Sequence, residues 1–218
     1  MVNFYENAVT AKCRQALGFL EQLPFLLDYY LAGGTALALQ IGHRISTDLD
    51  WFSTTQRLIS EERERLRIEL NKSEDLEITS EQDGLFFTRL FGTDVSFIYQ
   101  HHPLLEPTVE YSGIHLASPI DIGLMKLAAI NSRGTRRDFV DLYSLREAAP
   151  LNRLLDLAPL KYTDRPNFLA ITARALSYFD DADQQPMPRM LAPVLWKDVR
   201  AYCEAAAREL GRRFSDLQ

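Results

Sequence analysis

Two aspartates and two adjacent glycines lie within one short apolar stretch, and their types and spacing suit phosphate chemistry. The segment LAGGTALALQIGHRISTDLDWFS, residues 31–53, contains Gly33, Gly34, Thr35, Asp48 and Asp50. Backbone N–H groups at a glycine turn that opens a helix suit the oxygens of a phosphate chain. Two carboxylates on one strand face repel each other unless a cation lies between them, and Mg²⁺ prefers oxygen ligands. The segment predicts a site for a metal-bound triphosphate; the alternative is an ordinary turn followed by solvated charges.

A second polar cluster lies in LMKLAAINSRGTRRDFVDLYSL, residues 124–145. Lys126 and Arg133 share one helical face, because a helix has about 3.6 residues per turn. The cluster also contains Arg136, Arg137, Asp138 and Asp141. Cations here would neutralise a triphosphate and its leaving pyrophosphate. The alternative is a solvated helix face.

Apolar periodicity predicts the elements that hold the first motif. We expect a helix over 10–23, a buried strand over 25–34, a helix over 35–42 that ends at Gly42, and a strand over 46–53. In that last strand Asp48 and Asp50 alternate with apolar residues, so the carboxylates share one face. Ser60 is expected to cap a charged helix. Strand-like pieces between 75 and 103 predict an antiparallel meander with turns at QDG and FGTD.

Helices are predicted for the rest of the chain. Ser118 and Pro119 are a typical N-cap and first helical residue for the helix that carries Lys126, and a glycine ends it at Gly134. The next helix begins at once. Beyond Pro150 we expect helical segments around 151–158, 166–179 and 194–210.

Composition sets broad limits on class and location. The chain has 218 residues, of which 46% are hydrophobic, enough for one domain or for a domain with a helical appendage. With a formal net charge of -6, a general surface for binding polyanions is not expected, and any contact with nucleic acid would need a local basic patch. Cys13 and Cys203 have no metal-ligand spacing, and neither a signal peptide nor an apolar run of about 18 residues is present, so we expect a cytoplasmic protein with no membrane segment.

The two motifs together resemble the AbiEii/AbiGii-type nucleotidyltransferase toxin family. The resemblance covers about residues 25–148. It implies an α+β fold of the polymerase-β type, in which a mixed sheet is flanked by helices and a helical portion follows. The expected division is a nucleotidyltransferase-like core over 1–117 and a helical portion over 118–218 that completes the active site.

The resemblance also implies roles for single residues. Gly33, Gly34 and Thr35 would hold the triphosphate, together with Arg44, Lys126, Arg133 and Arg137. Asp48 and Asp50 would ligate metal, with Asp94 as a third metal ligand, and the catalytic set would be Asp48, Asp50, Lys126 and Asp138. The implied cofactor is Mg²⁺, as two ions, or Mn²⁺.

One departure concerns the third carboxylate that polymerase-β-like enzymes generally place on a following strand. Here that strand reads GTDVSFIYQHH, in which Asp94 and Ser96 share a face, so either residue is a candidate for the position. Asp138 is the alternative general base if Asp94 faces solvent. His43 is equally compatible with flanking a nucleotide and with capping a helix. His101 and His102 lack a ligand-spaced partner, which favours a turn over a metal site.

The resemblance implies transfer of a nucleotide from an NTP to an acceptor. The expected acceptor is RNA, such as a tRNA 3′ end, and the expected biological role is that of a toxin with an antitoxin protein as partner. Two alternatives stay open. The chain could be a non-catalytic nucleotide- or RNA-binding module that acts through a partner, or a structural protein in which the motifs are coincidental.

Overall fold

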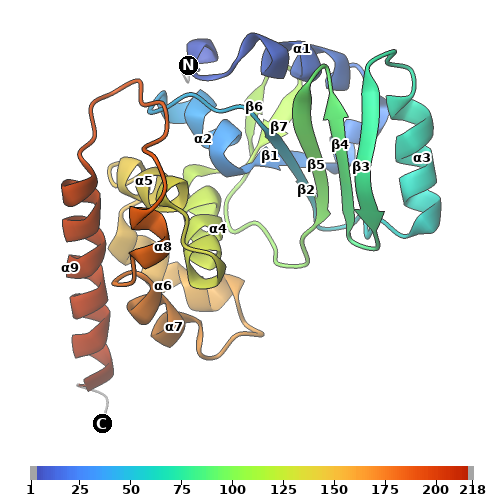
Figure 1. Ribbon diagram of the computed structural model, residues 1–218. Helices are drawn as coiled ribbons and strands as arrows, with labels where there is room; N and C mark the ends of the chain where they lie inside the picture. Colours follow the sequence, from blue (N-terminus) through green and yellow to red (C-terminus); the bar gives the residue numbers. More distant parts are fainter. Residues whose placement is uncertain (1–3, 216–218) are drawn as a thin grey trace. The chain divides into compact units, whose positions relative to one another are not determined.

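The computed structural model describes residues 4–215 (Figure 1). The chain divides into two compact units, the first ending at Ser118 and the second beginning at Pro119. No helix in the described part of the chain combines the length and the hydropathy that a membrane span requires. Each unit has its own hydrophobic core.

The first unit is built on a mixed sheet, as predicted. Within residues 4–215 the sheet contains seven strands in the order β3-β4-β5-β2-β1-β7-β6. Their bounds are β1 Tyr30–Ala32, β2 Leu49–Ser53, β3 Leu76–Gln82, β4 Leu85–Leu90, β5 Thr93–Tyr99, β6 Val109–Tyr111 and β7 Ile114–Leu116. The pairs β2/β5 and β1/β7 are parallel and the other neighbouring pairs are antiparallel. The predicted meander is confirmed as β3-β4-β5.

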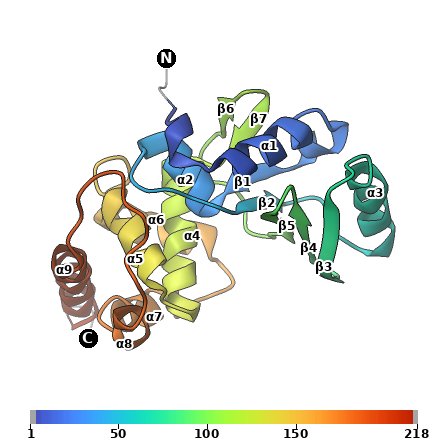
Figure 2. The ribbon, with the colours of Figure 1, turned by 45° about the horizontal axis from the view of Figure 1, so that its top comes forward.

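Helices and 3-10 turns accompany this sheet (Figures 1 and 2). They are η1 Glu6–Ala8, α1 Ala11–Leu20, η2 Pro24–Asp28, α2 Gly33–Ile41 and α3 Ser60–Leu70. The α2 helix packs against β1 and β2, and α3 packs against β3. Gly42 ends α2 in the left-handed conformation, with φ of 63°, as its position predicts.

Two local predictions in this unit need correction, and one hairpin was missed. The stretch 25–34 is not one strand: Pro24 opens the 3-10 turn η2, so β1 keeps only three residues. Ser60 is the first helical residue rather than the cap, and the N–H of Ile59 is bonded by the Glu62 carboxylate at 3.1 Å. The β6/β7 hairpin was not predicted, although its turn residues Ser112 and Gly113, both with positive φ, are a hairpin signal.

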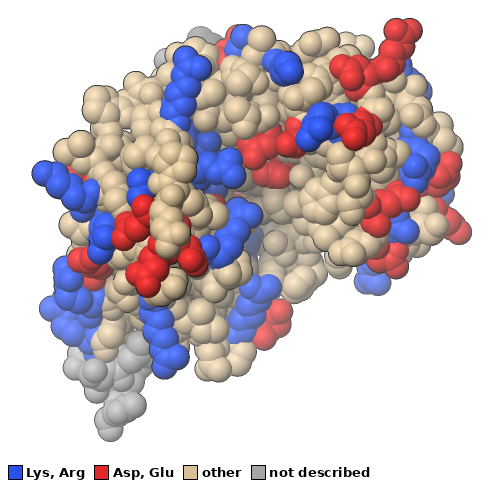
Figure 3. All heavy atoms as spheres, in the orientation of Figure 1, with Lys and Arg blue, Asp and Glu red and all other residues tan. Residues whose placement is uncertain are grey.

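The outer strand β3 and the neighbouring α3 carry interspersed charges. In the space-filling view, basic and acidic side chains alternate over the part of the molecule where Figure 1 draws these elements (Figure 3). Arg67 of α3 pairs with Glu81 of β3 at 2.7 Å, and Arg63 pairs with Asp83. Neither sign dominates this region, in keeping with the weak net charge.

The second unit is helical. Its elements are α4 Pro119–Ser132, α5 Arg136–Ser144, α6 Leu151–Lys161, α7 Phe168–Ala175, α8 Asp180–Asp183 and α9 Trp196–Ser215. The α4 helix packs against α5, α6 and α7, and α9 packs against α5 and α7. The start of α4 at Pro119 agrees with the prediction, whereas the short α8 lies in a segment that was expected to be a loop.

A buried ion pair fixes α6 to α4. Lys161, the last residue of α6, contacts Asp121 in the first turn of α4 at 2.7 Å, and neither side chain is exposed. The next residue, Tyr162, donates its hydroxyl proton to the carbonyl oxygen of Leu124 at 2.9 Å. These contacts hold the N-terminal half of the helix that carries Lys126.

Candidate functional site

The two glycines of the first motif leave room for two charged side chains. Gly33 has φ of +66°, and a Cβ atom on it would lie 2.9 Å from Oδ2 of Asp50. A Cβ atom on Gly34 would lie 2.1 Å from Nη2 of Arg44. The first turn of α2 is therefore open toward one carboxylate and one guanidinium. The N-cap residue Ala32 makes no side-chain cap bond, so the helix dipole and the backbone N–H groups of this turn suit an anion.

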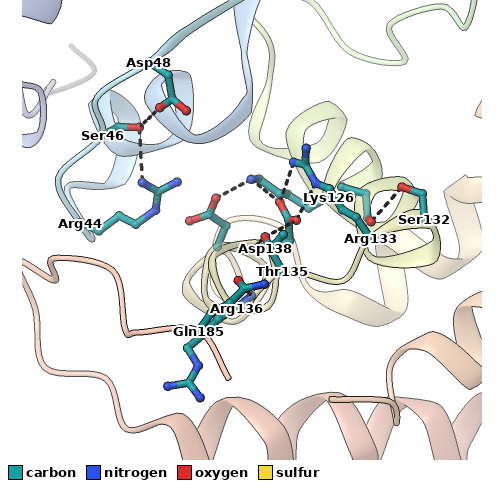
Figure 4. A network of polar contacts seen from close by, with 12 residues as sticks. Arg44, Ser46, Asp48, Lys126, Ser132, Arg133, Thr135, Arg136, Asp138 and Gln185 are labelled. Atoms are coloured by element: carbon teal, nitrogen blue, oxygen red, sulfur yellow. Dashed lines mark hydrogen bonds and ion pairs between the residues drawn. The ribbon is translucent and has the colours of Figure 1, made fainter. Parts of the chain in front are cut away.

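Thr35 ties the start of α2 to the residue that enters β2. Its hydroxyl donates to the backbone oxygen of Asp48 and lies 2.9 Å from the hydroxyl of Ser46. Ser46 is 3.4 Å from both Nη1 of Arg44 and Oδ1 of Asp48 (Figure 4). Sequence reasoning missed Ser46, which no spacing rule would have singled out. Thr35 thus has a positioning role here, and its contact with a nucleotide stays a prediction.

Arg44 is buried although it lies in a loop. Only 3% of it is exposed, and Nη1 donates to the carbonyl of Ile45 at 3.1 Å. His43 is buried as well. Since burying a guanidinium is costly, its fixed place beside Gly34 is a specific feature of this turn. The arrangement keeps a positive charge next to the first turn of α2.

Asp48 and Asp50 fit a site for a hard divalent cation. Leu49 and Trp51 of β2 are fully buried, whereas the aspartates between and before them are partly exposed, as the alternation predicts. Oδ2 of Asp50 lies against Gly33, at the first turn of α2. Partly exposed carboxylates suit Mg²⁺ or Mn²⁺, which keep several water ligands.

The strand β5 brings Ser96, not a carboxylate, next to Asp50. The parallel register pairs Asp50 with Ser96, and Asp94 lies two residues earlier on the same face. The Asp94 side chain is 68% exposed and pairs with Nε of Arg89 at 3.0 Å. Metal binding by Asp94 would require this ion pair to open, and it stays a prediction.

The second cluster converges on Asp138. Lys126 of α4 contacts Asp138 at 3.0 Å and Asp141 at 2.6 Å, both on α5 (Figure 4). Arg133 contacts Asp138 at 3.1 Å, and Thr135, the N-cap of α5, donates its hydroxyl proton to the same carboxylate at 2.6 Å. The predicted cluster thus forms a connected network. Asp141, which received no role from the sequence, lies closer to Nζ of Lys126 than Asp138 does.

Asp138 is held in its charged form. Burial disfavours the carboxylate, but the combined effect of Lys126, Arg133 and Thr135 is larger and lowers the pKa of Asp138 below its usual range. Among the donors, Lys126 is almost buried, while the Arg133 side chain is 65% exposed. Arg133 is therefore the donor that an incoming group can displace most easily.

The neighbouring arginines behave differently. Arg136 stacks over the Trp196 ring at 4.7 Å and donates to the carbonyl oxygens of Ala182 and Asp183, so it anchors α8. Arg137 is exposed. His102 is buried, and its Nδ1 lies 2.9 Å from Oε1 of Gln100.

Comparison with known proteins agrees with this arrangement. The family model described as "Nucleotidyl transferase AbiEii toxin, Type IV TA system" matches residues 17–217. The chain belongs to this family. The AbiEii match includes both polar clusters and most of the helical unit, a longer span than the motifs alone cover.

Individual relatives extend the AbiEii comparison. An uncharacterized protein of Aquifex aeolicus (strain VF5) is 32% identical over 212 residues, covering 93% of this chain and 94% of the relative. The antibiotic-resistance factor ANT(2'')-Ia shares the fold, with a TM-score of 0.54 at 12% identity over 75% of this chain and 94% of that chain. JHP933 of Helicobacter pylori aligns with a TM-score of 0.49 at 15% identity over 96% of each chain.

Proposed function

We propose that the chain transfers a nucleotide from an NTP to an RNA acceptor, such as a tRNA 3′ end, and that this activity makes it a toxin restrained by an antitoxin protein. In the reaction a hydroxyl of the acceptor attacks the α-phosphate, and pyrophosphate leaves. The observation that carries the proposal is the open first turn of α2, whose two glycines leave room for Asp50 and Arg44. Such a turn suits a triphosphate accompanied by a cation. A cytoplasmic location stays a prediction.

Residues of the first unit would bind the triphosphate. The backbone N–H groups of Gly33, Gly34 and Thr35 would donate to phosphate oxygens, and Arg44 would add a fixed positive charge. Asp48 and Asp50 would hold Mg²⁺ or Mn²⁺, which supplies charge neutralisation to the reacting phosphates when bound. Thr35 would keep Asp48 in place through the hydrogen bond to its backbone oxygen.

Residues of the second unit would handle the proton and the charge of the leaving group. Asp138 would accept the proton of the attacking hydroxyl once Arg133 turns to a phosphate, because losing that donor raises the basicity of the carboxylate. Lys126, with Arg133 and Arg137, would neutralise charge on the phosphates. This assignment needs no carboxylate at the position of Ser96.

A non-catalytic module is the second candidate, and the position of Ser96 beside Asp50 favours it. Such a module would bind the metal–NTP complex and act through its partner without transferring a nucleotide. Binding and transfer must therefore be measured separately.

The test is transfer of label from each α-labelled NTP to total cellular RNA in the presence of Mg²⁺. Wild type should label a discrete RNA band, and Asp48→Asn should lose about 100-fold or more of the activity while staying folded. The matched control is Asp28→Asn, the same change on a surface residue of the same unit that bonds Gln56, and it should keep full activity. Growth arrest on expression should follow the same pattern.

Three outcomes decide between the candidates. Full transfer by a folded Asp48→Asn variant would refute the assignment. NTP binding by wild type without labelled RNA would favour the non-catalytic module. Asp94→Asn, run in parallel, tests the third ligand, because a loss equal to that of Asp48→Asn would give Asp94 the metal role.

A further inference from the structure

A groove runs along the helical unit beside the cluster around Asp138. It consists of two adjoining hollows of about 540 Å³ and about 350 Å³. Both are lined by the C-terminal end of α4 and by α7, and they share Asn131, Ser132 and Ile171. The groove is thus continuous and lies entirely within the second unit. Its volume is in the range of sites that bind organic ligands.

Arginines give the groove a positive charge. Arg133 and Arg174 line the larger hollow and Arg165 lines the smaller one, against a single acidic lining residue, Asp181. Arg174 is exposed and makes no ion pair with any residue in 4–215. In a chain with a net charge of -6, this local excess of cations is a feature of the groove and not of the composition.

Exposed apolar side chains lie between these arginines. Tyr178 is 54% exposed and Ile171 is 48% exposed, and both line the larger hollow. Beside the smaller hollow, Phe168 stacks on Tyr162 at 4.2 Å, and Arg165 lies over the Tyr162 ring at 5.5 Å. Cations that alternate with an open aromatic face are typical of surfaces on which single-stranded bases stack.

Asn131, on the wall common to both hollows, has an unused hydrogen-bond acceptor. Its Nδ2 donates to Oγ1 of Thr172 at 2.9 Å, while its buried Oδ1 accepts no hydrogen bond from the described residues. A buried polar atom without a partner calls for a ligand or water.

We propose that this groove of α4 and α7 binds a single-stranded segment of the RNA acceptor, with Tyr178 stacking on a base and with Arg174 and Arg165 contacting the backbone. The proposal rests on the proposed function and deepens it by placing the acceptor on the chain. Arg133 belongs both to the groove and to the Asp138 network. A backbone phosphate in the groove would therefore compete with Asp138 for this guanidinium, which couples acceptor binding to release of the carboxylate.

The test is direct binding of a labelled, unstructured RNA of about ten nucleotides to the full chain without NTP, at about 0.1 M salt. Tyr178→Ala should raise the Kd about 5-fold or more, while Tyr178→Phe should bind like wild type, because stacking requires only the ring. Arg174→Ala should weaken binding. It should also reduce the slope of log Kd against log salt concentration by about one, which corresponds to the loss of one phosphate contact. The matched control is Arg212→Ala, which removes the same charge from the exposed arginine of α9 that pairs with Glu209.

The outcomes separate this proposal from the transferase assignment, because binding is measured without chemistry. Equal losses for Arg174→Ala and Arg212→Ala would overturn the groove and attribute binding to overall charge. Unchanged binding by Tyr178→Ala, no binding of RNA by wild type, or equally effective competition by a poly-glutamate peptide would also overturn it. If the groove is correct and the chain is active, Tyr178→Ala raises the KM for the acceptor and leaves the KM for NTP unchanged.

Discussion

At the scale of single residues, two positions require glycine because charged side chains from other parts of the chain pack against their backbone. Gly33 and Gly34 are glycines because Asp50 and Arg44 lie where their side chains would be. Glycine is required at both positions because a Cβ atom would collide with these side chains. At Gly33 the backbone requires it as well, since a φ of +66° is strained for any residue with a Cβ atom. The two glycines are therefore explained by contacts with two residues that are ten or more positions away in the sequence.

The prediction at this scale compares two glycines. Gly33→Ala should lower the free energy of unfolding by about 1–3 kcal/mol, since it adds backbone strain and pushes against the Asp50 carboxylate. Gly18→Ala, in the last turn of α1 with nothing within 4 Å of the added atom, should raise it by about 0.5–1 kcal/mol. Urea unfolding measures both. A stabilising Gly33→Ala would contradict the packing described here.

At the scale of elements, α4 is the scaffold of the second cluster. It carries Lys126 near its middle, contacts α5, α6 and α7, and is held at its start by the Asp121–Lys161 pair. A buried ion pair adds little net stability over an apolar pair of similar size. Removing one partner is strongly destabilising, however, because the other charge then stays buried without compensation. The pair therefore specifies how α6 meets α4.

A double substitution tests this role. Lys161→Met alone should cost about 3–5 kcal/mol of unfolding free energy, because it leaves the buried Asp121 carboxylate without its cation. Adding Asp121→Leu should recover most of that loss. The exposed pair Arg213–Asp156 is the control, and Arg213→Met should change stability by less than about 1 kcal/mol. Additive losses in the double variant would show that the two side chains are not coupled.

Local patterns predicted what depends on local geometry. The shared face of Asp48 and Asp50 follows from strand alternation, and the shared face of Lys126 and Arg133 follows from helical spacing. Their meeting with Asp138 is a contact between α4 and α5. The position of Ser96 beside Asp50 depends on how β2 pairs with β5, two strands that are far apart in sequence. Burial of Arg44 depends on a glycine ten residues earlier. Short elements such as α8 and β6 have too few residues to show periodicity.

At the scale of the whole molecule, the candidate residues are divided between two compact units. The glycine turn and both aspartates belong to the first unit, and the network around Asp138 belongs to the second. Each unit also contains one buried cysteine, Cys13 and Cys203, and neither forms a disulfide. The reactivity of each thiol can therefore be used to follow the unfolding of the core that contains it.

Thiol labelling should follow the two cores separately. Burial raises the pKa of Cys13 to about 11 and that of Cys203 to about 12, so iodoacetamide should modify neither thiol in the native protein. In increasing urea, peptide mapping should show two labelling transitions with different midpoints, because each unit has its own core. Coincident midpoints would mean that the units unfold as one, and rapid native labelling would contradict the burial.

The charged outer strand of the sheet has a consequence for how the protein behaves when it accumulates. Within residues 4–215, strand β3 is paired on one side only, and it exposes Glu77 and Glu81, which contact Arg89 and Arg67. A second copy that added its own β3 to this edge would bring carboxylates of both copies together and disturb these contacts. Edge-to-edge association through β3 is therefore disfavoured, which lowers the tendency of this edge to form fibrous aggregates when strong expression raises the protein concentration.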